Sequence, residues 1–179
     1  MAKGSGVRFY ARCILMSVPK VFIGIDNGVT GSIGVIGGDY SIYIQTPIRN
    51  VLNYTKKKAF LNRVDGVRLA NFFKIHCKAR DPFCFIERPM VNPGRWNATI
   101  SGVRAMEATL IVLESLKIPY QFVDSKEWQR ALLPSGLEKE ELKHASRDVG
   151  IRLFPTVDWK KWHDADGLLI AEYCRRIRG

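Results

Sequence analysis

The sequence predicts an α/β domain with a five-stranded mixed sheet, made of an antiparallel meander of three strands plus two parallel strands and flanked by helices. Two observations favour this class. Three short apolar runs separated by tight turns follow one another from Val21, and two further apolar runs then alternate with segments of helical periodicity. The 179 residues are 46% hydrophobic, which suits one compact domain.

The meander is predicted at VFIGID (21–26), SIGVIG (32–37) and YSIYIQT (40–46), with glycines in the first turn. Strands joined by such tight turns pair in antiparallel fashion. The polar and basic stretch 47–58 is expected to be a loop. Asn62 is expected to cap a helix in the segment that follows. The helical spacing there is that of Leu69, Phe72, Phe73 and His76.

A fourth strand is predicted at FCFIE (83–87), and because it follows a helix it should pair in parallel through a right-handed crossover. Residues 88–97 are expected to form a loop before a helix that bears Val103, Met106, Leu110 and Leu113. A fifth strand is predicted at 119–123. Capping-box spacing predicts helix starts at Asp124 with Glu127 and at Ser135 with Glu138, and a last helix from about Trp162. Its predicted common face holds Asp166, Ile170, Tyr173 and Ile177.

The charge balance indicates a polyanionic partner. There are 28 Lys and Arg against 17 Asp and Glu, a formal charge of +11. Nucleic acid is the first expectation, because neutralising phosphates releases counterions. A basic surface without any such partner is the alternative.

Composition also excludes several classes. The four cysteines form no C-x-x-C pair, so neither a zinc knuckle nor a disulfide framework is supported. No apolar stretch approaches the roughly 20 residues that span a bilayer. We therefore expect no membrane partner and an intracellular, soluble protein of a bacterial or phage-infected cytoplasm, or of an organelle. Residues 1–20 are expected to be a basic leader outside the core, and 21–179 a single domain.

Two acids stand at strand ends. Asp26 and Glu87 each close a buried apolar strand, and ligands of open α/β sheets gather beyond the carboxyl ends of strands. Asp26 before Asn27 and Gly28 is explained equally well as a turn residue. Glu87 could instead form a structural salt bridge with Arg88. Together, however, the two acids could converge on one metal site.

A third acidic position lies near the last helix. His163 and Asp166 are three residues apart, so on a helix both would lie on one face. Asp164 or Asp166 could instead complement the positive end of the helix dipole. Clustered carboxylates need a cation between them, and oxygen ligands suit Mg²⁺, or Mn²⁺ as a substitute, rather than Zn²⁺. Two such ions support phosphodiester hydrolysis.

Three motifs resemble those of the RuvC-type Holliday junction resolvases, a family of the ribonuclease H-like superfamily. FIGIDNGVTGSIGVI resembles their first-strand motif, FCFIERP their second acidic strand and HDADGLLIAEYC their final helix. GRWNATISGVRAMEATL and IPYQFVDSKEWQRALLP are similar to segments of phage, bacterial and chloroplast members. The resemblance implies a ribonuclease H-like fold and a homodimer without a small-molecule cofactor. It also implies symmetric paired nicks across a four-way DNA junction with two Mg²⁺ ions, leaving 5′ phosphate and 3′ hydroxyl ends.

The resemblance also implies roles for single residues. Asp26, Glu87 and Asp166 match metal-binding acids of the family, and His163 matches the first acid of a terminal D-x-x-D pattern. Asp164 is the alternative fourth ligand. Asn27 replaces a proline of the family's first motif, at a turn position that asparagine tolerates.

The DNA contacts are predicted from basic and aromatic residues. A loop after the second acidic strand could clamp phosphates and stack on an opened base, although its tryptophan could instead pack on the next helix. Lysines elsewhere are expected to contact phosphates as point charges. The predicted contacts are Arg88, Arg95, Trp96, Asn97, Lys56, Lys57, Lys58, Lys160 and Lys161.

Three other functions compete. Asp26-x-Gly28-x-Thr30 also fits the phosphate-binding hairpin of sugar-kinase and actin-like ATPases, but no second Asp-Gly hairpin motif is present. A transposase or a ribosomal RNA-processing nuclease of the same fold could carry a similar acidic set. A non-catalytic binding module would require every acid to be a turn, salt-bridge or capping residue.

Overall fold

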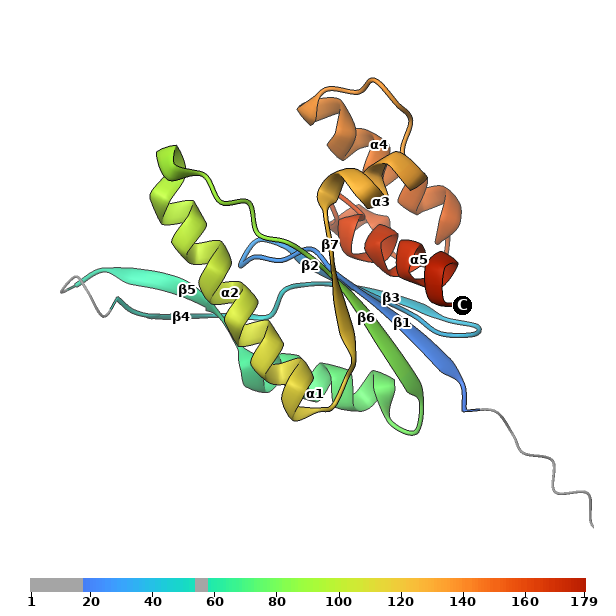
Figure 1. The fold of residues 1–179 in the computed structure, drawn as a ribbon, viewed down its shortest axis with the longest axis horizontal. Helices are drawn as coiled ribbons and strands as arrows, with labels where there is room; N and C mark the ends of the chain where they lie inside the picture. The colour runs from blue at the N-terminus through green and yellow to red at the C-terminus, as the bar shows by residue number, and fades with distance from the viewer. Residues whose placement is uncertain (1–17, 54–57) are drawn as a thin grey trace, which may run out of the picture.

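The computed structural model describes residues 18–53 and 58–179. Its main sheet has the strand order β3-β2-β1-β6-β7 (Figure 1). The first three of these strands pair antiparallel, and β1, β6 and β7 pair in parallel, which confirms the predicted mixed sheet. The strands are β1 (Lys20–Ile25), β2 (Ser32–Ile36), β3 (Ser41–Gln45), β6 (Asp81–Glu87) and β7 (Tyr120–Val123).

Helices cover both faces of the sheet (Figure 1). Helices α1 (Gly66–Cys77) and α2 (Trp96–Ser115) lie on one face, and α3 (Ser125–Leu132), α4 (Lys139–Leu153) and α5 (Asp166–Arg178) lie on the other. The period of two along β1 sends Val21, Ile23 and Ile25 into the core under α1 and α2, and Phe22 into the core under α5. Two apolar layers of about equal size therefore sandwich the sheet.

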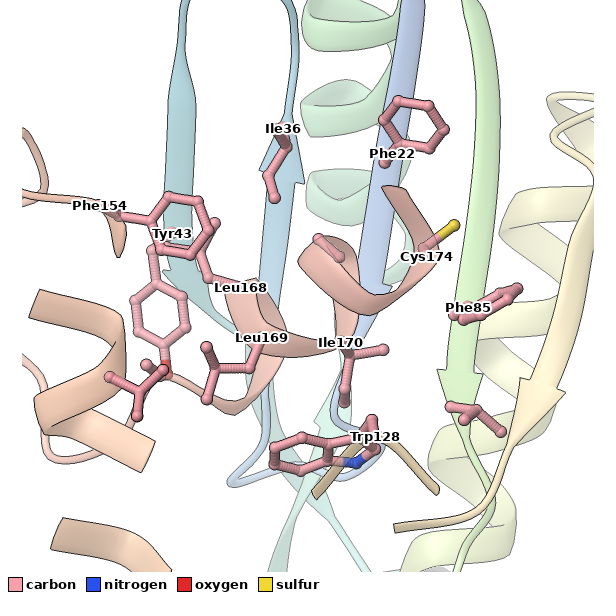
Figure 2. Close-up of a cluster of buried hydrophobic side chains, with 14 of the residues drawn as sticks. Phe22, Ile36, Tyr43, Phe85, Trp128, Phe154, Leu168, Leu169, Ile170 and Cys174 are labelled. Carbon is pink, nitrogen blue, oxygen red and sulfur yellow. The ribbon is translucent and has the colours of Figure 1, made fainter. Parts of the chain in front are cut away.

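Helix α5 lies unusually close to β1 and β2. A Cβ atom added to Gly24 would lie 2.1 Å from the backbone nitrogen of Ala171, and one added to Gly34 would lie 2.4 Å from the Cα of Leu168. These positions exclude any side chain, which lets the helix backbone contact the strands. Figure 2 shows Leu168, Leu169 and Ile170 of α5 against the sheet in this core. The first residue of the helix, Asp166, is thereby fixed beside the strand ends.

The prediction of a loop at 47–58 is wrong for most of the residues that the structure describes there. Strands β4 (Ile48–Leu52) and β5 (Phe60–Val64) form a two-stranded hairpin outside the main sheet. Asn62 lies in β5, where its side chain accepts a 3.0 Å hydrogen bond from Asn50 instead of capping a helix. The N-cap of α1 is Asp65, whose carboxylate accepts from the backbone N–H of Arg68. A short hairpin that buries little of either face gives no regular apolar alternation to detect.

Three helix starts also differ from prediction. The capping box of Asp124 and Glu127 is confirmed, but the next box joins Glu138 to Glu141, after a turn in which Gly136 has φ +81°. A short 3-10 turn, η1 (Pro93–Arg95), directly precedes α2. Helix α2 begins at Trp96, inside the segment 88–97 that was predicted to be a loop. The last helix starts at Asp166 rather than near Trp162, after a second turn, η2 (Trp159–Lys161).

Strand β1 begins at Lys20, one residue before the predicted start of the domain. No helix in the described part of the chain combines the length and the apolar character needed to cross a bilayer.

Candidate active site

The two strand-end acids leave the sheet side by side. Strands β1 and β6 are parallel neighbours in which Ile25 pairs with Ile86. Asp26 follows Ile25 directly and Glu87 follows Ile86, so both carboxylates lie at the same edge. The close packing of α5 brings the segment Asp164–Asp166 to that edge as well. Three stretches of sequence that are far apart therefore converge on one place.

Electrostatic coupling shows how near these groups are. Burial raises the pKa of Asp26 well above its ordinary value, and the charges of Glu87, Asp166 and Asp164 raise it further. Burial also raises the pKa of Asp166 to about 6; a hydrogen bond from Ser146 opposes the rise, and Asp164 and Glu87 add to it. Mutual repulsion among four carboxyl groups is what a shared cation would relieve. We call Asp26, Glu87, Asp164 and Asp166 the acidic cluster.

Helix α3 holds the side chain of Glu87. The indole Nε1–H of Trp128 donates to one carboxylate oxygen at 2.9 Å, and the hydroxyl of Ser125 donates to the other. Ser125 and Trp128 are one helical turn apart, so both donors point the same way. Trp128 is only 1% exposed, and Figure 2 shows its ring packed within the core. The orientation of Glu87 is consequently set by a buried and rigid partner.

The acids around the start of α5 are held in the same manner. The hydroxyl of Ser146 on α4 donates to Asp166 and accepts from the backbone N–H of Ala165 at 3.2 Å. The hydroxyl of Tyr43 on β3 donates to Asp164 at 2.6 Å. Burial and the adjacent Asp164 carboxylate raise the pKa of Tyr43, which keeps the phenol protonated as a donor. Asp164 and Asp166 therefore each accept a hydrogen bond from a different hydroxyl group.

His163 does not join the acidic cluster. Its side chain is exposed and makes no hydrogen bond to any described residue. Its charge is not among those that shift the pKa of Asp26 or of Asp166. The predicted helical spacing does not apply, because α5 begins only at Asp166. Of the two residues, Asp164 is the one whose charge raises the pKa of Asp26 and of Asp166.

Lys143 is a cation beside the cluster that sequence reasoning missed. It lies on α4 with an exposed side chain, and its charge lowers the pKa of both Asp26 and Asp166. Sequence reasoning also missed Tyr43, Ser125, Trp128 and Ser146. No local spacing signals these residues, because each acts through a contact between distant segments.

The predicted DNA-binding residues after β6 are all exposed to solvent, and one of them forms an ion pair. Arg88 forms an exposed 2.9 Å ion pair with Asp124 rather than with Glu87. Arg95, Trp96 and Asn97 are exposed at the start of α2, and Trp96 is 66% exposed, so it does not pack on the helix. A groove of about 290 Å³ beside them runs between the turn after Asp26 and α2. Its lining includes Asn27, Gly28, Thr30, Arg95, Thr99 and Gly102.

The predicted lysine contacts lie at two other places. Lys58 is exposed just before β5, and Lys56 and Lys57 lie outside the described residues. Lys160 and Lys161 are exposed on η2, where Lys161 is 3.5 Å from Asp158. None of these described lysines is among the charges that shift the pKa of Asp26 or of Asp166.

The chemistry of the acidic cluster fits a hard divalent cation. Its ligands would be carboxylate oxygens, with no thiolate or imidazole among them. Within residues 18–53 and 58–179, no three His, Cys, Asp or Glu side chains already have the spacing of a metal-binding group. Burial is the main cause of the raised pKa of Asp26 and of Asp166, and the charges of the neighbouring carboxylates raise both further.

Comparison with known proteins agrees on the fold. No family model and no curated protein sequence matches the chain. A Thermus thermophilus RuvC structure in complex with Holliday junction substrate has 17% sequence identity and a TM-score of 0.54, over 84% of this chain and 90% of that one. Another Thermus thermophilus RuvC structure has 18% identity and a TM-score of 0.47, over 88% and 96%. The first of these two likenesses shows that the chain has a RuvC-type, ribonuclease H-like fold.

Proposed function

We propose that the protein is a structure-selective endonuclease that resolves four-way DNA junctions by symmetric paired nicks. Hydrolysis with two Mg²⁺ ions would leave 5′ phosphate and 3′ hydroxyl ends, and Mn²⁺ would substitute. The observation that carries the proposal is the acidic cluster, since four carboxyl groups from three distant segments meet at one sheet edge and repel one another. The RuvC-type fold supports the choice of reaction.

The proposed metal ligands are Asp26, Glu87 and Asp166, with Asp164 completing the set. Ions bound there would activate a water for in-line attack on phosphorus and stabilise the departing 3′ oxygen. Ser125 and Trp128 hold Glu87 in place, and Ser146 holds Asp166. Such supporting hydrogen bonds fix the ligands before the substrate arrives.

The chain's basic and aromatic residues are proposed to hold the DNA. Lys143, beside the acids, is placed to attract the phosphate that is cut. Arg95 lines the groove beside the turn after Asp26, and the exposed Trp96 and Asn97 follow it in the chain, so all three could contact a strand near the crossover. Arg88, the lysines 56–58 and the pair Lys160 and Lys161 complete the proposed set of phosphate contacts.

A homodimer is proposed for symmetric cutting. Two copies related by a two-fold axis would place two acidic clusters on two strands of a symmetric junction. Helix α2 exposes Val103 and Ile111, at 41% and 62%. This surface is the candidate interface. Residues 21–179 would form the nuclease domain, and the leader would lie outside it.

The test is incubation with labelled four-way junction, linear duplex and single-stranded RNA, with Mg²⁺ or a chelator. We expect paired nicks on the junction only, and only with the metal. Asp26→Asn should cut at least a thousandfold more slowly yet still bind the junction. Preferred cutting of RNA, or cutting of linear duplex alone, would instead favour an RNA-processing or transposase-type nuclease. Full activity in Asp26→Asn would reject the acidic cluster as the active site.

A further inference from the structure

We infer that the β4–β5 hairpin is a DNA-binding arm that contacts phosphates with its basic residues and packs an apolar pair of side chains on bases exposed at a branch. The inference extends the proposed function, because it assigns the distinction between junction and linear duplex to a segment outside the acidic cluster. The arm comprises Ile48–Leu52 and Phe60–Val64, together with Lys58.

The hairpin starts at the same sheet edge as the acidic cluster. Strand β3 ends where Gln45 pairs with Ser32, and the N–H of Thr46 donates to the carbonyl of Gly31, in the turn that follows Asp26. The N–H of Asp65 donates to the carbonyl of Pro47 at 2.7 Å, which closes the base of the hairpin. Figure 1 shows the two strands projecting from there, past α2 and away from the main sheet. A DNA arm that leaves the acidic cluster could therefore continue along the hairpin.

One face of the hairpin concentrates positive charge. Arg49 and Arg63 are directly opposite each other on neighbouring strands, an arrangement that destabilises an isolated hairpin. Both are exposed, and so is Lys58, which lies in the turn just before β5; none of the three forms an ion pair with an acid of the described chain. The sequence from Tyr40 to Val64 contains no Asp or Glu. A polyanion is the ligand that this unbalanced charge accommodates.

The other face exposes an apolar pair. Leu52 and Phe60 are cross-strand partners at the outer end of the described ladder, and they are 58% and 66% exposed. Nearer the base, the same face continues through Asn50 and Asn62 to Val64, which is buried in the core. A two-stranded ribbon fits the major groove of DNA, and aromatic side chains stack on unpaired bases of any sequence. Arginines without an acidic partner on one face and an exposed aromatic on the other are both suited to DNA.

The charge is tested by the triple variant Arg49→Ser, Lys58→Ser and Arg63→Ser. Binding of a fluorescent four-way junction is measured by anisotropy over a range of salt concentrations, without divalent metal. The slope of log affinity against log salt should become shallower by about 0.9 for each phosphate that the arm no longer neutralises, or up to about 2.7. The control variant removes Lys74, Lys78 and Lys117, three exposed lysines at the opposite end of the domain, and should keep the slope nearer that of the wild type. Equal slopes for both variants would overturn the inference.

The apolar pair is tested by Leu52→Ser with Phe60→Ser. We expect about a tenfold loss of junction affinity, with little change for linear duplex, because the branch point interrupts base stacking and exposes base faces that the inside of a duplex does not. The control is Val67→Ser with Ile75→Ser on α1, which are 67% and 71% exposed. Unchanged junction binding would overturn the inference. So would a variant that changes only from dimer to monomer in sedimentation, since the pair would then contact a second copy.

The two proposals fail separately. If the wild type nicks junctions and both hairpin variants bind and nick them equally well, the arm is rejected and the nuclease stands. If the wild type never nicks a junction but the hairpin variants lose DNA binding, the nuclease is rejected and the arm stands. Thermal melting confirms folding, and because one variant removes charges and the other removes apolar side chains, either can test the arm alone.

Discussion

At the scale of single residues, the acids and their supporting donors differ in how far sequence predicts them. Asp26 and Glu87 were predictable because each follows a run of buried apolar residues, where an unpaired carboxylate is costly. The supporting hydrogen-bond donors were not predictable, because Tyr43 is 121 residues from Asp164 and Trp128 is 41 residues from Glu87. No periodicity within a strand or helix reports such a contact.

Trp128→Phe tests whether the indole hydrogen bond positions Glu87. The change keeps an aromatic ring in the core and removes the only donor that the ring has. Junction cleavage should fall by about 10- to 100-fold and recover in part at higher Mg²⁺ concentration. The control is Trp159→Phe, whose Nε1–H donates to the carbonyl of Phe154 instead. Equal activity in the two variants would leave Trp128 with a packing role alone.

Asp164 and His163 are separated by their own substitutions. Only Asp164 lies within the acidic cluster, so Asp164→Asn should reduce cleavage by at least tenfold and raise the Mg²⁺ concentration required. His163→Gln should cleave within about threefold of the wild type, because the exposed imidazole has no role in the cluster. The measurement is single-turnover cleavage across a Mg²⁺ titration. The opposite ranking would restore His163 as the ligand.

At the scale of elements, local pattern predicted the main sheet but not the β4–β5 hairpin. In β1 and β6 the core imposes apolar residues on successive positions, and the strands were found from that signal. In β4 almost every side chain is exposed, so Arg49 and Asn50 gave the segment the composition of a loop. The predicted cap at Asn62 failed for the same reason, since its amide pairs across the hairpin.

The position of α5 depends on glycines in the strands beneath it. An added Cβ on Gly34 would lie 2.5 Å or less from backbone atoms of Leu168 and Gly167, which cannot yield as a flexible side chain would. Gly34→Ala should therefore push α5 outward, cost about 1–3 kcal/mol in free energy of unfolding and displace Asp166. We expect a lower melting temperature together with weaker cleavage. Gly38→Ala, which meets nothing within 4 Å, should change neither.

At the scale of the whole molecule, the acidic cluster links stability to pH and metal. An unfolded aspartate has a pKa near 3.8, whereas that of Asp166 in the folded protein is about 6. Between these values the folded chain binds more protons than the unfolded chain, so its stability falls as the pH rises through this window. Above its folded pKa the carboxyl group of Asp166 is charged, so the full cost of burying that charge near Asp164 and Glu87 lowers the stability of the folded chain.

The melting temperature of the metal-free protein should therefore decline between about pH 4 and about pH 6, by about 3 °C for each kcal/mol of stability lost. Mg²⁺ should restore it at pH 7, because a bound cation stabilises the folded state. Asp26→Asn should flatten the decline by removing one of the repelling charges. A melting temperature that rises steadily over this range without metal would show that the acids are not coupled as described.

The central claim is that distant acids meet to bind divalent ions, and the most direct test counts those ions. Mn²⁺ bound to the protein is measured by electron paramagnetic resonance for the wild type, for Glu87→Gln and for Asp148→Asn, whose acid is exposed and outside the cluster. We predict about two ions for the wild type and for Asp148→Asn, and clear loss of binding for Glu87→Gln. A Glu87→Gln protein that binds Mn²⁺ as the wild type does would contradict the shared site.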